Sequence, residues 1–220
     1  SANQAVDSDK NSSSKGMGSF TMAITILFSF ALGIGLFVIL PERLASLVSD
    51  QGFLFNLVDG FIRLAVFFLY VLVISKSKNI ARVFEYHGAE HKSIHTYEAG
   101  EELTDENVLN KSTLHPRCGT AFLLTVMVVG ILVFSIFGKP ESILVRIGTR
   151  LLLIPLIAGV SYEIIKFASK KRDSMLMRLI IKPGLWLQQL TTKEPSRDQV
   201  QVAIQSLKAV LDMEKETENV

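Results

Sequence analysis

Residues 20–40 read FTMAITILFSFALGIGLFVIL and contain no charged side chain. The hydrocarbon core of a bilayer is about 30 Å thick and a helix rises about 1.5 Å per residue, so about 20 apolar residues are enough to cross it. This stretch therefore predicts a membrane-spanning helix that stops at Pro41.

Three further segments are long and apolar enough to cross a bilayer: residues 53–75, 119–138 and 143–168. Residues 119–138 are again uncharged, whereas the other two segments contain a few charged side chains. We therefore predict an all-α polytopic membrane protein with four transmembrane helices in contact with the lipid bilayer.

The composition agrees with this class of protein. Hydrophobic residues make up 49% of the 220 residues, the net charge is +2 and the mean hydropathy is +0.36. These values are too apolar for an ordinary soluble domain. The near-neutral charge balance also gives no reason to expect nucleic-acid binding. A single cysteine excludes an internal disulfide.

Lysine and arginine are distributed unevenly between the two sides of the predicted bundle. The first and third links contribute only Arg43 and Lys139. The opposite side collects Lys10, Lys15, Lys76, Lys78, Arg82, Lys92, Lys111, Arg117, Lys170, Lys171 and Arg172. Because positive residues concentrate in cytoplasmic loops, both ends of the chain are predicted to lie in the cytosol.

These segments divide the chain into five parts. Residues 1–19 are polar and predicted to be flexible, 20–75 and 119–168 form two transmembrane hairpins, 76–118 form a cytosolic link, and 169–220 form helices in the cytosol or at the membrane interface. The link and the last part together predict a small helical cytosolic subdomain. The chain starts without methionine or a signal-peptide pattern, which we interpret as the start of a fragment.

The C-terminal part contains two predicted helices. Residues 175–190 combine apolar side chains with Arg178 and Lys182, which is typical of a helix at the membrane interface and also compatible with cytosolic core. After Pro195, apolar residues recur at three- and four-residue spacing, at Val200, Ile204, Leu207 and Leu211. This predicts an amphipathic helix whose buried face packs on this chain, on a missing N-terminal region or on a partner protein.

The link contains every histidine and the only cysteine of the chain: His87, His91, His95, His115 and Cys118. Residues 79–99 are predicted to be helical, with Gly100 placed to end the helix. Residues four apart share a helix face, so the first three histidines are expected to form a ladder with Glu98 near its end.

Two short patterns in the link suggest a zinc site. His87-Gly-Ala-Glu90-His91 fits the H-x-x-E-H order of one class of zinc peptidases, in which the glutamate is the general base. His115-Pro-Arg-Cys118 supplies a second pair of metal-binding side chains, so that four groups could close a tetrahedral site. The alternative is structural, because polar residues are excluded from the spans and the histidines could be hydrogen-bonded within a packed subdomain.

Charged residues within the predicted spans also have two interpretations. Asp59 and Arg63 are four residues apart and could neutralise each other, while Arg146 and Arg150 could reach the headgroups. Alternatively, Asp59, Arg63 and Arg150 face inward and line a polar groove for a lipid headgroup or an inserting polypeptide.

Three long motifs resemble the bacterial YqhQ-like family of multi-spanning membrane proteins: EYHGAEHKSIHTYEAGEELT, LHPRCGTAFLL and KPGLWLQQLTTKEPSRDQVQVAIQSLKAVL. The resemblance covers nearly the whole chain and implies a bacterial cytoplasmic membrane protein of a family described as metal-dependent enzymes. The signature residues that it implies are His87, Glu90, His91, His95, His115, Arg117 and Cys118. The family usually has a further N-terminal region with a GGQAVIEGV-like motif, which this sequence lacks.

Two hypotheses for the function follow. The first is a membrane-bound zinc hydrolase, in which His87, His91 and either His115 or Cys118 hold the metal and Glu90 activates water. The second is a non-catalytic membrane factor that assists the assembly or transport of membrane proteins or lipids, with a protein partner on the C-terminal amphipathic helix.

Overall fold

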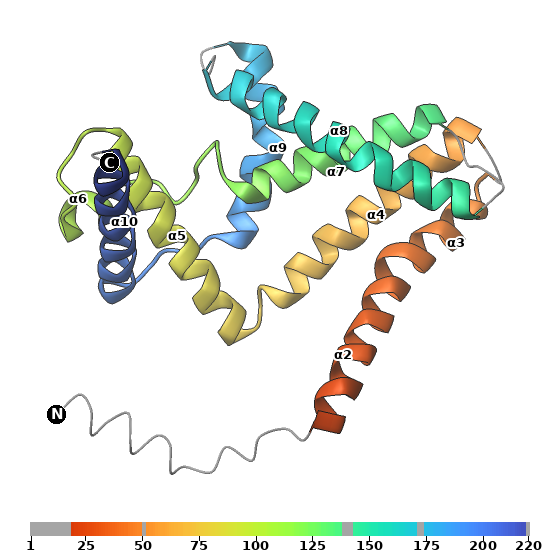
Figure 1. Ribbon diagram of the computed structural model, residues 1–220, viewed down its shortest axis with the longest axis horizontal. Coiled ribbons are helices and arrows are strands. Elements are labelled where there is room, and N and C mark those ends of the chain that lie inside the picture. The colour runs from red at the N-terminus through yellow and green to blue at the C-terminus, as the bar shows by residue number, and fades with distance from the viewer. Residues whose placement is uncertain (1–18, 50–51, 138–142, 171–173, 219–220) are drawn as a thin grey trace.

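The computed structural model describes residues 19–49, 52–137, 143–170 and 174–218, and every regular element in these ranges is a helix (Figure 1). The predicted flexible segment, residues 1–19, lies almost entirely outside the described residues. Four helical stretches are long and apolar enough to cross a membrane: Phe20–Ser46, Gly52–Ile74, Gly119–Ile136 and Gly148–Ala168. The all-α fold with four candidate transmembrane helices is therefore confirmed.

The first span differs from its prediction at Pro41. Helix α2 (Ser19–Ile34) continues through a π-helical turn (Gly35–Ile39) into α3 (Leu40–Ser46), so the helical stretch passes the proline instead of stopping there. Proline is tolerated in the first turn of a helical segment, where its missing N–H is not needed. The π-helical turn starts a new α-helical segment at Leu40 and places Pro41 in that first turn.

Helices α4 (Gly52–Ile74), α7 (Gly119–Phe137), α8 (Ile143–Lys170) and α9 (Met175–Thr191) form the main bundle (Figure 1). Helix α7 is central, since it packs against the other three. Two glycines permit the closest approaches. A Cβ atom added to Gly60 would lie 2.5 Å from Ile131, and one added to Gly184 would lie 2.8 Å from the Cβ of Ala121.

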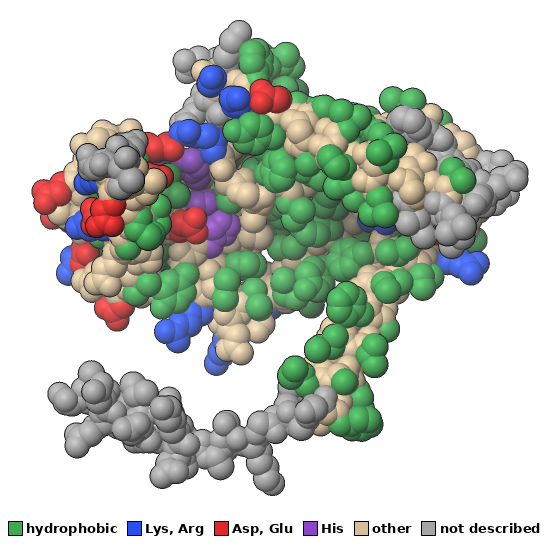
Figure 2. All heavy atoms as spheres, in the orientation of Figure 1, with side chains coloured by type: hydrophobic (Ala, Val, Ile, Leu, Met, Phe, Trp, Pro, Cys, Tyr) green, Lys and Arg blue, Asp and Glu red, His purple; other side chains and the backbone are tan. Residues whose placement is uncertain are grey.

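Helix α2 extends away from this bundle and has no buried residue among those described (Figure 1). Its apolar side chains, including Leu27 and Phe28, are largely exposed. Figure 2 shows hydrophobic side chains covering the bundle surface as well. Surfaces of this kind are stable in lipid, because lipid tails are as apolar as the side chains that they cover.

The second packing unit contains α5 (Lys78–Glu98), α6 (Asp105–Leu109) and α10 (Arg197–Glu218). Its core consists of Ala89, Val108, Val200 and Ile204, all buried. The sequence left open whether the apolar face of the C-terminal helix packs on this chain, on a missing N-terminal region or on a partner. In the structure, the apolar face of α10 packs against α5 and α6 of the same chain.

Helix α9 was expected either at a membrane interface or in a packed core, and its two halves differ in this respect. Its first half exposes apolar side chains, with Met175 at 89% and Leu179 at 67% exposure, whereas Leu187 and Gln188 in the second half are completely buried. The helix therefore begins at the surface of the bundle and ends in its core, next to the link that carries His115 and Cys118.

Candidate metal centre

The histidine ladder lies on helix α5, whose end is fixed by glycine. Gly100 has a positive φ of 69°, and the N–H groups of Gly100 and Glu101 donate to the carbonyls of Tyr97 and Thr96 at 2.9 and 3.1 Å. This is the Schellman pattern that ends many helices. The helix is therefore continuous from Lys78 to Glu98, and its histidines at four-residue spacing share one face.

His87, His91 and Cys118 form a first group, which we call the His–Cys group. The Nε2 atom of His87 lies 3.2 Å from Cys118 Sγ, and one ligand atom from each of the three residues lies within 4.8 Å of the others. Helix α5 supplies both histidines, and the cysteine immediately precedes α7.

Backbone carbonyls fix the orientation of both imidazoles in the His–Cys group. His87 Nδ1 lies 2.8 Å from the Thr191 carbonyl and His91 Nδ1 lies 2.5 Å from the Thr113 carbonyl. A carbonyl only accepts hydrogen bonds, so Nδ1 carries a proton in each ring and Nε2 is the nitrogen left for a ligand, which in His87 shares a hydrogen bond with Cys118 Sγ. Metal-binding histidines typically have this arrangement.

Cys118 occupies a position that favours the thiolate. It is 7% exposed, and Thr120 lies beside its sulfur through its hydroxyl at 3.2 Å and its N–H at 3.4 Å. Burial alone would raise the pKa of the thiol, but hydrogen bonds with His87, His91 and Thr120 outweigh it and lower the pKa to about 5. The hydrogen bond with Cys118 in turn raises the pKa of His87. Sulfur is therefore available as an anion near neutral pH.

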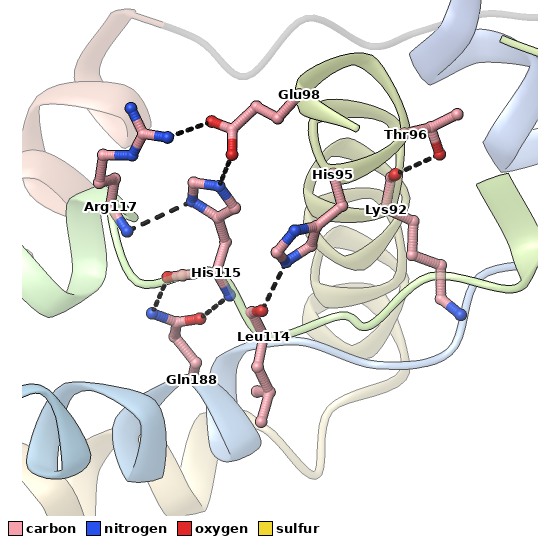
Figure 3. Close-up of polar contacts among 8 residues, drawn as sticks. All are labelled: Lys92, His95, Thr96, Glu98, Leu114, His115, Arg117 and Gln188. Carbon is pink, nitrogen blue, oxygen red and sulfur yellow. Dashed lines mark hydrogen bonds and ion pairs between the residues drawn. The ribbon is translucent and has the colours of Figure 1, made fainter. Parts of the chain in front are cut away.

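His95, Glu98 and His115 form a second group, which we call the His–Glu group. Figure 3 shows that both ring nitrogens of His115 are engaged: Nε2 lies 3.4 Å from Glu98, and Nδ1 accepts the Arg117 N–H at 3.3 Å. The Arg117 guanidinium also donates to Glu98 at 2.6 Å. His115 and Glu98 therefore already have hydrogen-bond partners within this group and in Arg117.

Burial and charge act differently on the two ionisable partners of the His–Glu group. Burial is the main reason why the pKa of His115 is lowered, although the hydrogen bond with Glu98 opposes it. Burial alone would raise the pKa of Glu98, but His115 and Arg117 outweigh this effect and lower it. The expected state near neutral pH is a neutral imidazole beside a carboxylate that pairs with arginine.

Gln188 anchors the link that carries His115. Its side-chain oxygen accepts the His115 N–H at 2.8 Å, and its amide group donates to the His115 carbonyl at 2.8 Å (Figure 3). His95 Nε2 also bonds the neighbouring Leu114 carbonyl at 2.8 Å. The link is thus held between α9 and α5. The sequence analysis missed Gln188, whose only signal was an amide within an apolar helical stretch.

Gly88, within the H-x-x-E-H pattern, permits a close backbone approach. A Cβ atom there would lie 2.1 Å from the Lys193 carbonyl oxygen, and the Lys193 N–H donates to the Phe84 carbonyl at 2.9 Å. The segment after α9 therefore crosses α5 at this glycine. The crossing holds the Thr191 carbonyl against His87, and sequence reasoning did not assign this role to Gly88.

The four imidazoles form a row instead of converging on one point. Ring centroids are 4.4 Å apart for His87 and His91, 5.8 Å for His91 and His115, and 4.6 Å for His95 and His115. The predicted single tetrahedral site is thus divided between two adjacent groups. The predicted pair His115 and Cys118 contributes one member to each group.

Glu90, the predicted general base, belongs to neither group. It is exposed and lines a groove between α5 and α10 with Tyr86 and Val202. The structure therefore places this carboxylate beside the His–Cys group along the helix but does not aim it into the group.

The intramembrane candidates lie elsewhere, between α4, α7 and α8. Arg63 donates to both oxygens of Asp59 at 3.0 and 2.8 Å, so the two residues neutralise each other. They also line a cavity of about 320 Å³ with Asn56 and Arg150, and the Arg150 guanidinium lies 5.7 Å from the ring centre of Phe134. Asp59 and Arg63 therefore neutralise each other, and they also line a cavity within the spans. Arg146 has no described side chain.

Comparisons with known proteins show which sequences this chain is similar to. The sequence model of a family described as "Protein of unknown function (DUF1385)" matches residues 1–213. The "Uncharacterized protein YqhQ" of Bacillus subtilis (strain 168) is 38% identical over 200 residues, which cover 88% of this chain and 62% of that protein. The chain thus spans less than two thirds of the length of this relative. No solved structure matches the chain.

Proposed function

The chain belongs to the DUF1385 family, and we propose that it is an integral membrane metalloprotein whose metal ligands are His87 Nε2, His91 Nε2 and Cys118 Sγ. The observation that carries the proposal is the orientation of the two imidazoles. Each binds a backbone carbonyl through Nδ1, and the ligand atoms of the three residues lie within 4.8 Å of one another.

Zinc is the metal that these ligands suit best. Two imidazole nitrogens and one thiolate match its preference for nitrogen and sulfur, and three protein ligands leave one position of a tetrahedron for water or substrate. Sites with such an open position are typical of catalytic zinc. A bound zinc ion would lower the pKa of its water to about 7 and polarise a substrate carbonyl or phosphoryl group.

We propose hydrolysis as the reaction, with a role for Glu90 next to His91. Its negative charge is among the smaller influences, after the Cys118 hydrogen bond, that raise the pKa of His87. In this proposal His87, His91 and Cys118 hold the metal, and Glu90 acts on them only through its charge, because its carboxylate faces the groove between α5 and α10. Glu90→Gln is therefore expected to leave the metal content unchanged and to reduce, but not abolish, turnover of any substrate that is hydrolysed.

The His–Glu group is assigned a supporting role. Both ring nitrogens of His115 are engaged, and the Glu98 carboxylate pairs with Arg117. A metal would have to replace contacts with the residues around this group, whereas in the His–Cys group the Nε2 contact of His87 is with Cys118, another proposed ligand. The His–Glu group thus stabilises the link that carries Cys118.

Metal analysis of the full-length protein, purified in detergent, tests the proposal. About one equivalent of zinc per chain is expected, with almost complete loss in the double variant His87→Ala plus His91→Ala. Glu98→Gln is the matched control in the other group and should retain the metal. Undiminished zinc in the double variant would refute the assignment.

Cobalt substitution provides a second measurement that reports on the sulfur ligand. Replacing zinc with cobalt should produce a thiolate-to-cobalt charge-transfer band, because Cys118 contributes the sulfur. The band should be absent in Cys118→Ser while Glu98→Gln retains it. A cobalt complex without this band would show that Cys118 is not a ligand.

A second candidate function is favoured by the cavity between α4, α7 and α8. Asp59 and Asn56 are buried there among apolar side chains, and polar residues at membrane depth often mark binding sites. This supports a non-catalytic factor that assists membrane proteins or lipids. Crosslinking from a photoreactive residue at Gly130, which also lines the cavity, should then capture a discrete membrane component. Recovery of uncrosslinked protein only would count against this candidate.

A further inference from the structure

A second cavity, of about 1080 Å³, lies between the first half of α9 and the link before Cys118. The link and α5 contribute His95 and Leu114, and α9 contributes Arg178, Leu179, Lys182 and Leu185. It is separate from the cavity within the spans and adjoins the histidine row at His95. Neither the proposed metal ligands nor the predicted general base lines it.

The cavity is basic. Arg178 and Lys182 are four residues apart, so they lie on one face of α9, and both are exposed. No residue that lines the cavity is acidic, and neither cation forms an ion pair with any residue in the described ranges. The Lys182 ammonium lies 5.5 Å from the ring centre of Trp186. Two unneutralised cations on one wall favour an anionic occupant.

Apart from His95 and Ser112, the remaining lining residues are apolar, and most of them belong to α9 at the surface of the bundle. Leu176, Leu179 and Leu185 line the cavity, and the first two are more than 60% exposed. Figure 2 shows basic side chains beside the histidines, with hydrophobic side chains next to them. Since α9 follows α8, which is long and apolar enough to cross a membrane, we infer that its exposed apolar surface lies at the boundary between lipid and water. The occupant must therefore combine an anionic head with an apolar body.

We propose that this cavity binds an anionic membrane phospholipid, with its phosphate between Arg178 and Lys182 and an acyl chain along the apolar residues of α9. Inorganic phosphate has the same head chemistry but would leave the apolar walls in contact with water. The headgroup would lie beside His95, at one end of the histidine row. Lipid binding at this site does not require the metal, so it can be tested with or without zinc.

The only tryptophan of the chain provides a local probe. Trp186 lies on α9, is 56% exposed and contacts Lys182, so bromine atoms on a bound acyl chain will quench its fluorescence. The full-length protein is reconstituted into vesicles that contain a small fraction of brominated phosphatidylglycerol or brominated phosphatidylcholine. Quenching by the anionic lipid is expected at about tenfold lower mole fraction, because two cations attract its net negative charge, which the choline group cancels in the other lipid.

A double variant and a matched control distinguish a site from general surface attraction. Arg178→Gln plus Lys182→Gln should abolish the preference for the anionic lipid. Lys78→Gln plus Arg82→Gln removes two exposed cations at the same spacing on α5, outside the cavity, and should preserve it. Equal quenching by both lipids, or equal loss of preference in both double variants, would overturn the proposal.

Added inorganic phosphate separates the two sources of the anion. If the cavity binds lipid, millimolar phosphate should leave quenching by brominated phosphatidylglycerol unchanged, because free phosphate cannot match the buried apolar contacts. Complete displacement by phosphate at constant ionic strength would show a phosphate site without lipid selectivity and would overturn the proposal.

Discussion

The two groups of ionisable residues on the histidine face contain similar side chains but differ in their hydrogen-bond partners. In the His–Cys group, carbonyls occupy Nδ1 of both imidazoles and leave Nε2 directed toward the sulfur. In the His–Glu group, His115 uses both nitrogens and the carboxylate pairs with arginine. The difference teaches that the partner of each ring nitrogen, and not spacing along the helix, separates the histidines that we propose as ligands from the histidine to which we assign a structural role.

The largest expected effect compares His91→Ala with His95→Ala. Each substitution removes one imidazole and one hydrogen bond to a carbonyl of the link, so their structural costs are similar. Only His91 is a proposed ligand. Zinc affinity, measured by competition with a chelator, is expected to fall more than about 100-fold in His91→Ala and less than about threefold in His95→Ala. Equal losses would remove the distinction between the groups.

The thiol of Cys118 provides a pH test in the metal-free protein. Its thiolate absorbance should titrate near pH 5 and move toward the ordinary range in His87→Ala, because the hydrogen bond from that histidine favours the anion. The pKa of the thiol is about 5 in the folded protein and 9.0 without these contacts, so ionisation of Cys118 stabilises the fold. This stabilisation is complete above pH 9, decreases as the pH falls, and is lost below about pH 5. Titration of the unmodified protein near pH 9 would contradict the assigned geometry.

Gly88→Ala should affect the His–Cys group more than the His–Glu group. The new methyl group would meet the Lys193 carbonyl and push the segment after α9 away from α5. We expect a loss of about 2 to 3 kcal/mol in the free energy of unfolding, from overpacking against rigid backbone. Gly100→Ala, at the end of the same helix, controls for stability alone, and it should retain zinc affinity while Gly88→Ala weakens it.

Gln188→Leu should have the smallest effect and should act on the other group. It removes both hydrogen bonds to the backbone of His115 and leaves buried polar groups unpaired, at a cost of about 2 kcal/mol. Gln189→Leu alters an exposed neighbour and should change the unfolding free energy by less than about 0.5 kcal/mol. Thermal unfolding in detergent measures both, and similar values for the two variants would argue against the anchor.

The spans could be predicted because lipid imposes a simple rule on composition and length. The helix that carries the histidines was predictable as well, from continuous helical residues followed by Gly100. The end of the first span at Pro41 was predicted wrongly, because a π-helical turn restarts the helix there. A local pattern cannot reveal such a change of hydrogen bonding.

The sequence identified the residues of both groups but not their grouping. His115 and Cys118 are separated by two residues, yet one lies with Glu98 and the other with His87. That division depends on the path of the link, which Gln188 and Gly88 determine from distant parts of the chain. Glu90 fits the H-x-x-E-H pattern, but its carboxylate does not belong to the His–Cys group.

The position of Cys118 gives the site a mechanical property. The sulfur belongs to the residue before α7, whereas both nitrogens belong to α5 outside the spans. Helix tilt in a membrane responds to bilayer thickness. If the proposed site holds an ion in a bilayer, thinner or thicker lipid would therefore draw the sulfur toward or away from the two nitrogens, and metal binding would depend on bilayer thickness.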